Sequence, residues 1–147
     1  CFQLFFIFLV YQMIFSSLTF HPEQLFLGVL IFFIASICYM FLCMMVELIS
    51  LWADNVWTLM VMLKFFVTFF GGGIIPMDFF PDWSQKILAL TPFPYLISLP
   101  VKTMMGLMPL NESIMGIGVL VIWSCIFLGL LQLLWSKGQK SYTGVGI

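Results

Sequence analysis

Three long stretches of this chain contain no Asp, Glu, Lys or Arg: residues 1–20, 25–46 and 114–135. The hydrocarbon core of a bilayer is about 30 Å thick and requires about 20 apolar residues in a helix. Each stretch is long enough, so the sequence predicts three membrane-spanning helices. Composition agrees, because only 7% of the 147 residues are charged, against about 25% in soluble domains.

A fourth apolar stretch, residues 57–75, is interrupted by Lys64. A lysine at the centre of a span costs about 2.5–3.5 kcal/mol on insertion scales. Lys64 lies seven residues after Trp57, near enough to one end for its ammonium group to reach the interface. We therefore expect a fourth span, and an all-α integral membrane fold in which residues 1–147 form a single transmembrane domain.

The lysines favour one orientation. Lys137 and Lys140 directly follow the last predicted span, and basic residues concentrate on the cytoplasmic side of membranes. A cytoplasmic C-terminus and alternating crossings place residues 76–113 outside. The net charge of −1 and the lack of a basic cluster argue against a nucleic acid as partner.

The first residues do not have the pattern of a signal peptide, because no basic segment and no small-residue cleavage site accompany them. They have instead the composition of a spanning helix. We expect the chain to be the C-terminal portion of a longer, multi-pass protein of a bacterial plasma membrane.

The segment GGGIIPMDFFPDW, residues 71–83, interrupts the apolar pattern. Glycine weakens a helix by about 1 kcal/mol and proline by about 3 kcal/mol, so Gly71, Gly72, Gly73 and Pro76 should end the preceding helix near the outer face. Two short pieces follow, residues 82–91 and 95–106. Asp82 is expected to cap the first of them, with Gln85 at the capping-box position.

Neither short piece can cross a bilayer, so residues 81–106 are predicted to form a re-entrant hairpin. Backbone groups freed at membrane depth need compensation. We expect it to come from Trp83, Ile87, Phe93 and Leu96, packed against the outer ends of the spans. The hairpin is then either a moving gate or a static lid, and both alternatives remain open.

Small and polar residues recur on one face of each clear span. Such faces allow membrane helices to approach closely and form hydrogen bonds, so they serve either helix contacts or a substrate path. They are Gln12, Ser16 and Thr19 in the first span, Ser36, Tyr39 and Cys43 in the second, and Gly118, Cys125, Gly129 and Gln132 in the last.

Enzyme chemistry is not indicated. The sequence contains no GxxxxGK[ST] phosphate loop, no CxxC pair and only one histidine, His21, so neither a nucleotide site, a zinc site nor a catalytic triad can be assembled. The carboxylates fall in loops or at span ends. We predict no catalytic, metal or cofactor site on this chain.

The segments IPMDFFPDW and LTPFPYLISLPVKTMMG resemble the last third of ABC-2 type transporter permeases, in the branch of multidrug-type permeases. The shared pattern consists of Gly73, Pro76, Phe80, Pro81, Trp83, Pro92, Phe93, Pro100 and Gly106.

This resemblance implies a six-span permease in which the four spans predicted here are the third to the sixth. Two short extracellular helices would precede the last span. Two permease subunits would pair, as a homodimer or a heterodimer, and engage cytoplasmic ATPase subunits that hold ATP and Mg²⁺. The chain would then form the substrate path and extracellular gate of an ABC exporter. The alternative is a non-transporting membrane subunit that anchors or assembles a larger complex.

Overall fold

A computed structural model describes residues 22–52 and 55–141, and all their regular structure is helical. The predicted all-α class is confirmed for these residues. The predicted first span, residues 1–20, lies outside the described part of the chain, and so do Gln12, Ser16 and Thr19.

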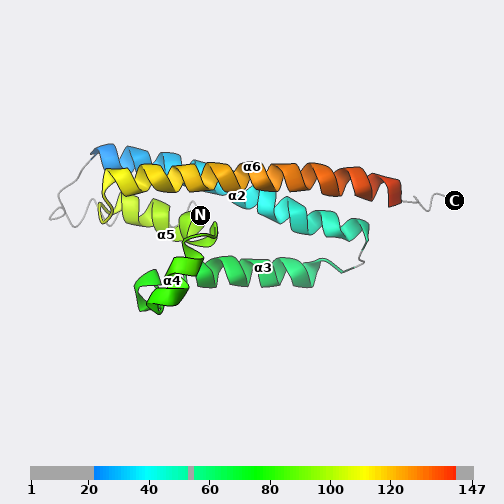
Figure 1. The fold of residues 1–147 in the computed structure, drawn as a ribbon, viewed down its shortest axis with the longest axis horizontal. Helices are drawn as coiled ribbons and strands as arrows, with labels where there is room; N and C mark the ends of the chain where they lie inside the picture. Colours follow the sequence, from blue (N-terminus) through cyan, green and yellow to red (C-terminus); the bar gives the residue numbers. More distant parts are fainter. Residues whose placement is uncertain (1–21, 53–54, 142–147) are drawn as a thin grey trace.

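Two long helices form the body of the molecule. Helix α2 covers Pro22–Leu48 and helix α6 covers Leu110–Ser141, and they lie side by side along most of their length (Figure 1). Their 27 and 32 residues correspond to about 40 and 48 Å at 1.5 Å per residue, more than a bilayer core requires. The spans predicted at residues 25–46 and 114–135 are thus found inside longer helices.

Helix α3, Trp57–Phe70, follows a 3-10 turn, η1, at Ile49–Leu51. Its 14 residues measure about 21 Å, less than the thickness of a bilayer core. The helix predicted over residues 57–75 is therefore too long at its C-terminal end, because the glycines at positions 71–73 end it directly after Phe70.

The segment between α3 and α6 contains short helices, as predicted. They are the 3-10 turn η2 at Met77–Phe79, helix α4 at Asp82–Leu88 and helix α5 at Phe93–Met104. The axes of α4 and α5 meet at 98°. The pieces predicted at residues 82–91 and 95–106 both exist, the first shorter and the second displaced by two residues.

The core lies where α5 fits against the two long helices. Buried side chains come from α2, α3, α5 and α6 and form one cluster: Ile31, Ala35, Cys38, Val67, Leu96, Leu99, Leu120 and Phe127. Most other large apolar side chains of the long helices are exposed, as suits a protein surrounded by lipid. Figure 1 shows α5 at the end of the bundle where α6 begins, opposite the connection between α2 and α3.

Among the described helices, α2 and α6 are long and apolar enough to cross a membrane. The bent pair α4–α5 makes a third span if it is counted as one broken helix. The predicted number of four spans therefore stays a prediction.

Candidate functional site

The three consecutive glycines end α3 in a Schellman motif. The Gly73 N–H donates to the Thr68 carbonyl at 2.8 Å, and the Gly72 N–H donates to the Phe69 carbonyl at 3.4 Å. Gly72 has a φ of +82°, the left-handed conformation that this motif requires and that glycine adopts without a steric penalty. The prediction that this cluster stops the helix is confirmed.

Gly71 brings the end of α3 against α5. A Cβ atom at this position would meet the Ile97 side chain and the Phe93 carbonyl oxygen, so only glycine allows this approach. The carbonyl of Gly71 accepts a hydrogen bond of 2.6 Å from the Ser98 hydroxyl of α5. A serine of the next helix thus compensates a carbonyl group freed by the end of α3.

The bend between α4 and α5 is compensated in the same way. The Tyr95 hydroxyl donates to the Ala89 carbonyl at 2.9 Å, and the Trp123 indole of α6 donates to the Leu90 carbonyl at 3.2 Å. The backbone carbonyls of Ala89 and Leu90, directly after the end of α4, therefore each accept a hydrogen bond from a side chain of α5 or α6.

Helix α4 begins differently from our prediction. Its N-cap residue is Pro81, with no side-chain cap hydrogen bond, and Asp82 is the first helical residue. Gln85 does not close a capping box, because its amide Nε2 donates to the Phe80 carbonyl at 2.7 Å. Because Pro81 takes the N-cap position, Asp82 lies in the first turn of α4. Its carboxylate there still interacts favourably with the helix dipole.

The expected apolar contacts of the hairpin form only in α5. Leu96 is buried, and Phe93 lies beside Phe70 with 6.3 Å between ring centroids. Trp83 and Ile87 of α4 are exposed, so the prediction that they pack against the spans is wrong for the helices that the structure describes. The 98° bend turns their side of α4 away from the bundle.

Helix α5 is held between the long helices by two glycines. A Cβ at Gly28 of α2 would meet Met104, and a Cβ at Gly116 of α6 would meet Leu99. Helix α5 then ends in a second Schellman motif with Gly106 at a φ of +69°. These close approaches define a fixed seat for α5.

A buried hydrogen bond joins α5 to the beginning of α6. The hydroxyl oxygens of Thr103 and Ser113 are 3.1 Å apart, and both side chains are fully buried. The Thr103 hydroxyl donates to the Leu99 carbonyl at 2.8 Å, so the single proton of the Ser113 hydroxyl is divided between Thr103 Oγ1 and the Pro109 carbonyl. Buried polar groups that are all paired stabilise one arrangement over its alternatives.

The contacts of α6 give the register of the hairpin. Thr103 contacts Ser113, Leu99 lies beside Gly116, and the Leu90 carbonyl binds Trp123. Helix α5 therefore runs antiparallel to α6. Ten residues separate Ser113 from Trp123, which corresponds to about 15 Å along the helix. The bend after α4 is therefore about 15 Å further along the bundle than the turn between α5 and α6.

An ion pair joins the segment before α4 to the end of α5. The Lys102 ammonium lies 3.3 Å from the Asp78 carboxylate. The pair is largely exposed, so its contribution is on the order of 0–1 kcal/mol. It places η2 at the same end of the bundle as the turn after α5.

The remaining predicted hairpin residues contact either aromatic rings or α5. Phe80 meets Phe69 edge to face, with 5.8 Å between ring centroids. Pro92 is buried and precedes the first residue of α5, while Pro100 is buried inside that helix. Pro76 and Pro81 are exposed. Of the predicted set, Pro92, Phe93 and Pro100 thus belong to α5 or its first turn, whereas Pro76, Pro81 and Trp83 are exposed.

The predicted stripe of α6 is exposed and lies on the side opposite its buried residues. Gly118, Cys125, Gly129 and Gln132 are all exposed, and no described atom comes within 4 Å of a Cβ added at either glycine. On α2, Tyr39 and Cys43 are half-buried, and the exposed Ser36 donates to the Phe32 carbonyl of its own helix. The two glycines of the α6 stripe therefore have open space beside them within the described residues.

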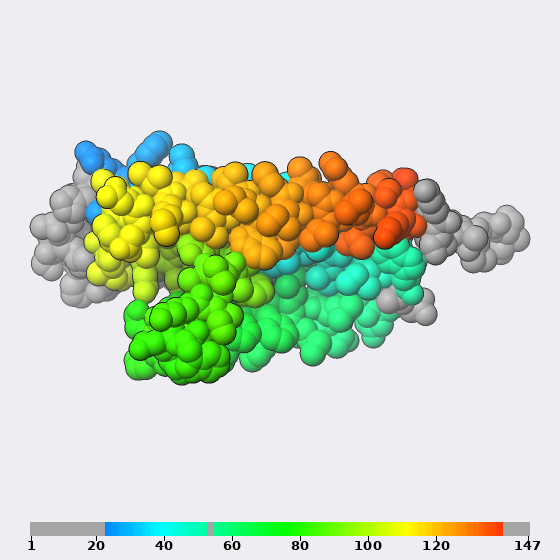
Figure 2. Space-filling view, viewed as in Figure 1, coloured from blue at the N-terminus to red at the C-terminus, as the bar shows by residue number. Residues whose placement is uncertain are grey.

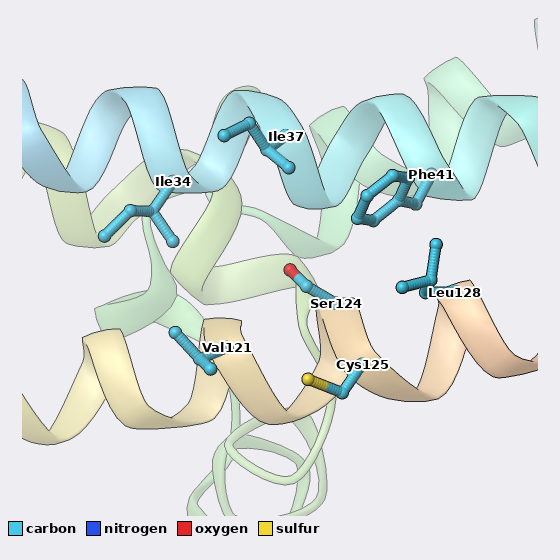
Figure 3. Close-up of a pocket in the computed structure, with 7 residues that line it drawn as sticks. All are labelled: Ile34, Ile37, Phe41, Val121, Ser124, Cys125 and Leu128. Atoms are coloured by element: carbon cyan, nitrogen blue, oxygen red, sulfur yellow. The ribbon is translucent and has the colours of Figure 1, made fainter.

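A shallow pocket of about 200 Å³ opens between α2 and α6. Figure 3 shows side chains of the two helices facing each other across it, with Ser124 and Cys125 on α6. Apart from these two residues its lining is apolar: Ile34, Ile37, Phe41, Val121 and Leu128. Among the predicted path residues that fall in the described part of the chain, Cys125 alone lines this pocket.

The described residues contain no group of three or more His, Cys, Asp or Glu side chains that could hold a metal ion. The donors that complete the hairpin, Ser98, Tyr95 and Trp123, were not predicted. In the sequence, the only sign of their role is that they are polar residues within apolar helices. The hydrophobic pattern does not indicate which carbonyl group each side chain binds.

A family model described as ABC-2 family transporter protein matches residues 2–146. Neither the curated proteins nor the solved structures gave a significant match.

Proposed function

Because the chain belongs to the ABC-2 family of transporter proteins, we propose that it is the membrane-spanning permease subunit of an ABC exporter. ATP hydrolysis takes place in separate cytoplasmic subunits, which hold ATP and Mg²⁺, and a second permease subunit completes the path. This chain supplies the path and its gate and performs no chemistry of its own.

The orientation belongs to the same proposal. The C-terminal end of α6, with Lys137, faces the cytoplasm, and the segment from Gly71 to Gly106 faces the outside. Residues 81–106 then enter the membrane from outside and return without crossing it. The 15 Å register along α6 supports this arrangement, because it corresponds to about half of a 30 Å core.

The observation that carries the gate proposal is the contrast between the two arms of the hairpin. Helix α5 is seated by Gly28, Gly116 and the buried Thr103–Ser113 pair. In helix α4 only Leu88 is buried. We infer that α5 is the fixed arm and that α4, with the glycine turn before it, is the arm that moves during transport.

Replacing Gly71–Gly73 with three alanines tests the gate. Alanine at position 72 opposes the left-handed conformation, and the change favours extension of α3 by about one turn. Export from proteoliposomes that contain the partner ATPase should fall or become uncoupled from ATP hydrolysis, while expression and ATPase association persist. Unchanged coupled export with a lengthened α3 would identify the hairpin as a static lid.

The same assay distinguishes a transporter from an anchoring subunit. A chain that only anchors a complex retains its ATPase partner but gives no ATP-dependent export in wild-type form. Failure of every tested substrate class to stimulate ATP hydrolysis by the wild-type complex would contradict the exporter proposal.

A further inference from the structure

One side of the segment η2–α4 carries a row of exposed apolar side chains. Phe79, Trp83, Ile87 and Leu90 are 79%, 69%, 57% and 77% exposed. Trp83 and Ile87 lie four residues apart on one side of α4, while Phe79 belongs to η2 before it and Leu90 to the turn after it. We call these four residues the α4 stripe.

The rest of α4 is polar. Asp82 and Lys86 are exposed, and Gln85 is half-buried beneath the Phe80 carbonyl that it binds. An apolar side next to a charged side makes α4 amphipathic, although it is too short to cross a membrane. Segments of this kind lie in the boundary between lipid headgroups and acyl chains.

The direction of α4 fits such a boundary. Helix α5 runs antiparallel to α6, as the Thr103–Ser113 and Leu99–Gly116 contacts require. Helix α4 meets α5 at 98°, so it lies across the long axis of the bundle. When α6 spans a bilayer, α4 lies close to the membrane plane.

The depth of the segment is bounded on both sides. Asp78 pairs with Lys102, which is next to the Thr103 that contacts Ser113, directly before the apolar residues 114–135 of α6. Leu90 lies about 15 Å further along, at Trp123. The segment therefore starts at the boundary of the apolar zone and enters it, and its end at Leu90 lies deeper than the roughly 5–10 Å insertion of interfacial helices.

The apolar surface of α3 continues onto this segment. The exposed Phe65 stacks on Phe69 at 5.7 Å, and Phe69 meets Phe80 at 5.8 Å. Figure 2 shows the residues around α4 as a lobe that projects beside α3 from the body formed by α2 and α6. The aromatic surface of α3 therefore reaches Phe80, the residue next to Phe79 of the α4 stripe.

We propose that the α4 stripe is a lipid-binding surface at the membrane boundary nearest the α5–α6 turn. Its four apolar side chains insert among acyl chains, and the Lys86 ammonium meets the headgroup phosphates. The Trp83 ring has the amphipathic character that is enriched at this level. The inference requires only that the chain lies in a bilayer, and it is independent of what is transported.

Spin labels test the surface directly. Trp83→Cys and Ile87→Cys are labelled in a full-length background without other cysteines, reconstituted into vesicles of phosphatidylcholine and phosphatidylglycerol. Asp82→Cys and Lys86→Cys on the polar side of the same helix are the matched controls. Collisions with O₂ should exceed those with a water-soluble nickel chelate several-fold at positions 83 and 87, and the ratio should reverse at 82 and 86.

Two results would overturn the proposal. Access of the nickel chelate to positions 83 and 87 would place the stripe in water, and protection from both reagents would mean that protein, such as a second copy, covers it. A second measurement avoids the cysteine variants: bromolipids should quench the fluorescence of the wild-type chain more than that of Trp83→Phe. Equal quenching of the two proteins also contradicts the proposal.

Discussion

The indole N–H of Trp123 donates to the backbone carbonyl of Leu90, 33 residues earlier in the chain, at 3.2 Å. This bond connects the middle of α6 to the bend between α4 and α5. In the proposed orientation this carbonyl lies within the bilayer, where water is scarce, so it depends on a protein donor. The bond therefore fixes how far the hairpin reaches along α6.

Trp123→Phe should destabilise the chain. Phenylalanine keeps a ring beside Phe127, 5.3 Å away, but leaves the Leu90 carbonyl without its donor, at a cost of about 1–3 kcal/mol. We expect the midpoint of thermal unfolding in detergent to fall by several degrees. Trp135→Phe, at an exposed position of the same helix, is the control, and an equal loss there would refute the role of this bond.

Ser98→Ala should loosen the junction between α3 and α5. It removes the 2.6 Å hydrogen bond to the Gly71 carbonyl and should cost about 1–3 kcal/mol. Hydrogen exchange at residues 71–73 should become faster. Ser36→Ala removes only a bond to a carbonyl of its own helix, so exchange there and global stability should stay close to wild type.

Gly116→Ala and Gly118→Ala form a matched pair on α6. A Cβ at position 116 would overlap the Leu99 side chain, whereas no described atom is within 4 Å of one at position 118. Overpacking typically costs about 1–3 kcal/mol, so Gly116→Ala should lower thermal stability. Gly118→Ala should preserve or raise it, because alanine is the better helix former; comparable losses in both variants would show that α5 is not seated on Gly116.

Gly129→Leu tests whether the exposed α6 stripe is a contact between permease subunits. A leucine at this open position should weaken association of two copies, measured by crosslinking in nanodiscs. Its own fold should persist, since Gly129 makes no close contact in the described chain. Leu130→Ala, one position away on another side of α6, should leave association unchanged, and equal effects would exclude the stripe as the interface.

The proposed orientation predicts opposite accessibility for two positions. Ser84→Cys in α4 should react with an impermeant maleimide on intact cells, and Gln139→Cys near the end of α6 should react only after permeabilisation. Labelling of both from one side would contradict the crossing pattern.

The long helices could be predicted from hydropathy alone, but not their ends. Helix α2 begins three residues before the apolar stretch at 25–46, and α6 begins four residues before Ile114. Polar residues such as Glu23 and Asn111 are tolerated in helix turns outside the lipid. Hydropathy reports the extent of the apolar zone and not the extent of the helix.

Features of the hairpin that depend on backbone conformation could be predicted from the sequence. Features that depend on tertiary contacts could not. Gly71–Gly73 end α3 because glycine adopts the left-handed turn, a property of the residue itself. The outward direction of Trp83 and the donors Ser98 and Trp123 depend on the angle between α4 and α5. Periodicity within one helix contains no information on that angle.

The seat of α5 also sets an order of assembly. One wall, Gly28, belongs to α2, which is synthesised before α5, whereas Gly116, Ser113 and Trp123 belong to α6, which is synthesised after it. Until α6 has been inserted, the twelve residues of α5 lack the wall formed by Gly116 and Ser113, and they are too few to remain in the bilayer as a span of their own. The hairpin can therefore settle only after α6 has been synthesised, and α6 acts as the template on which it closes.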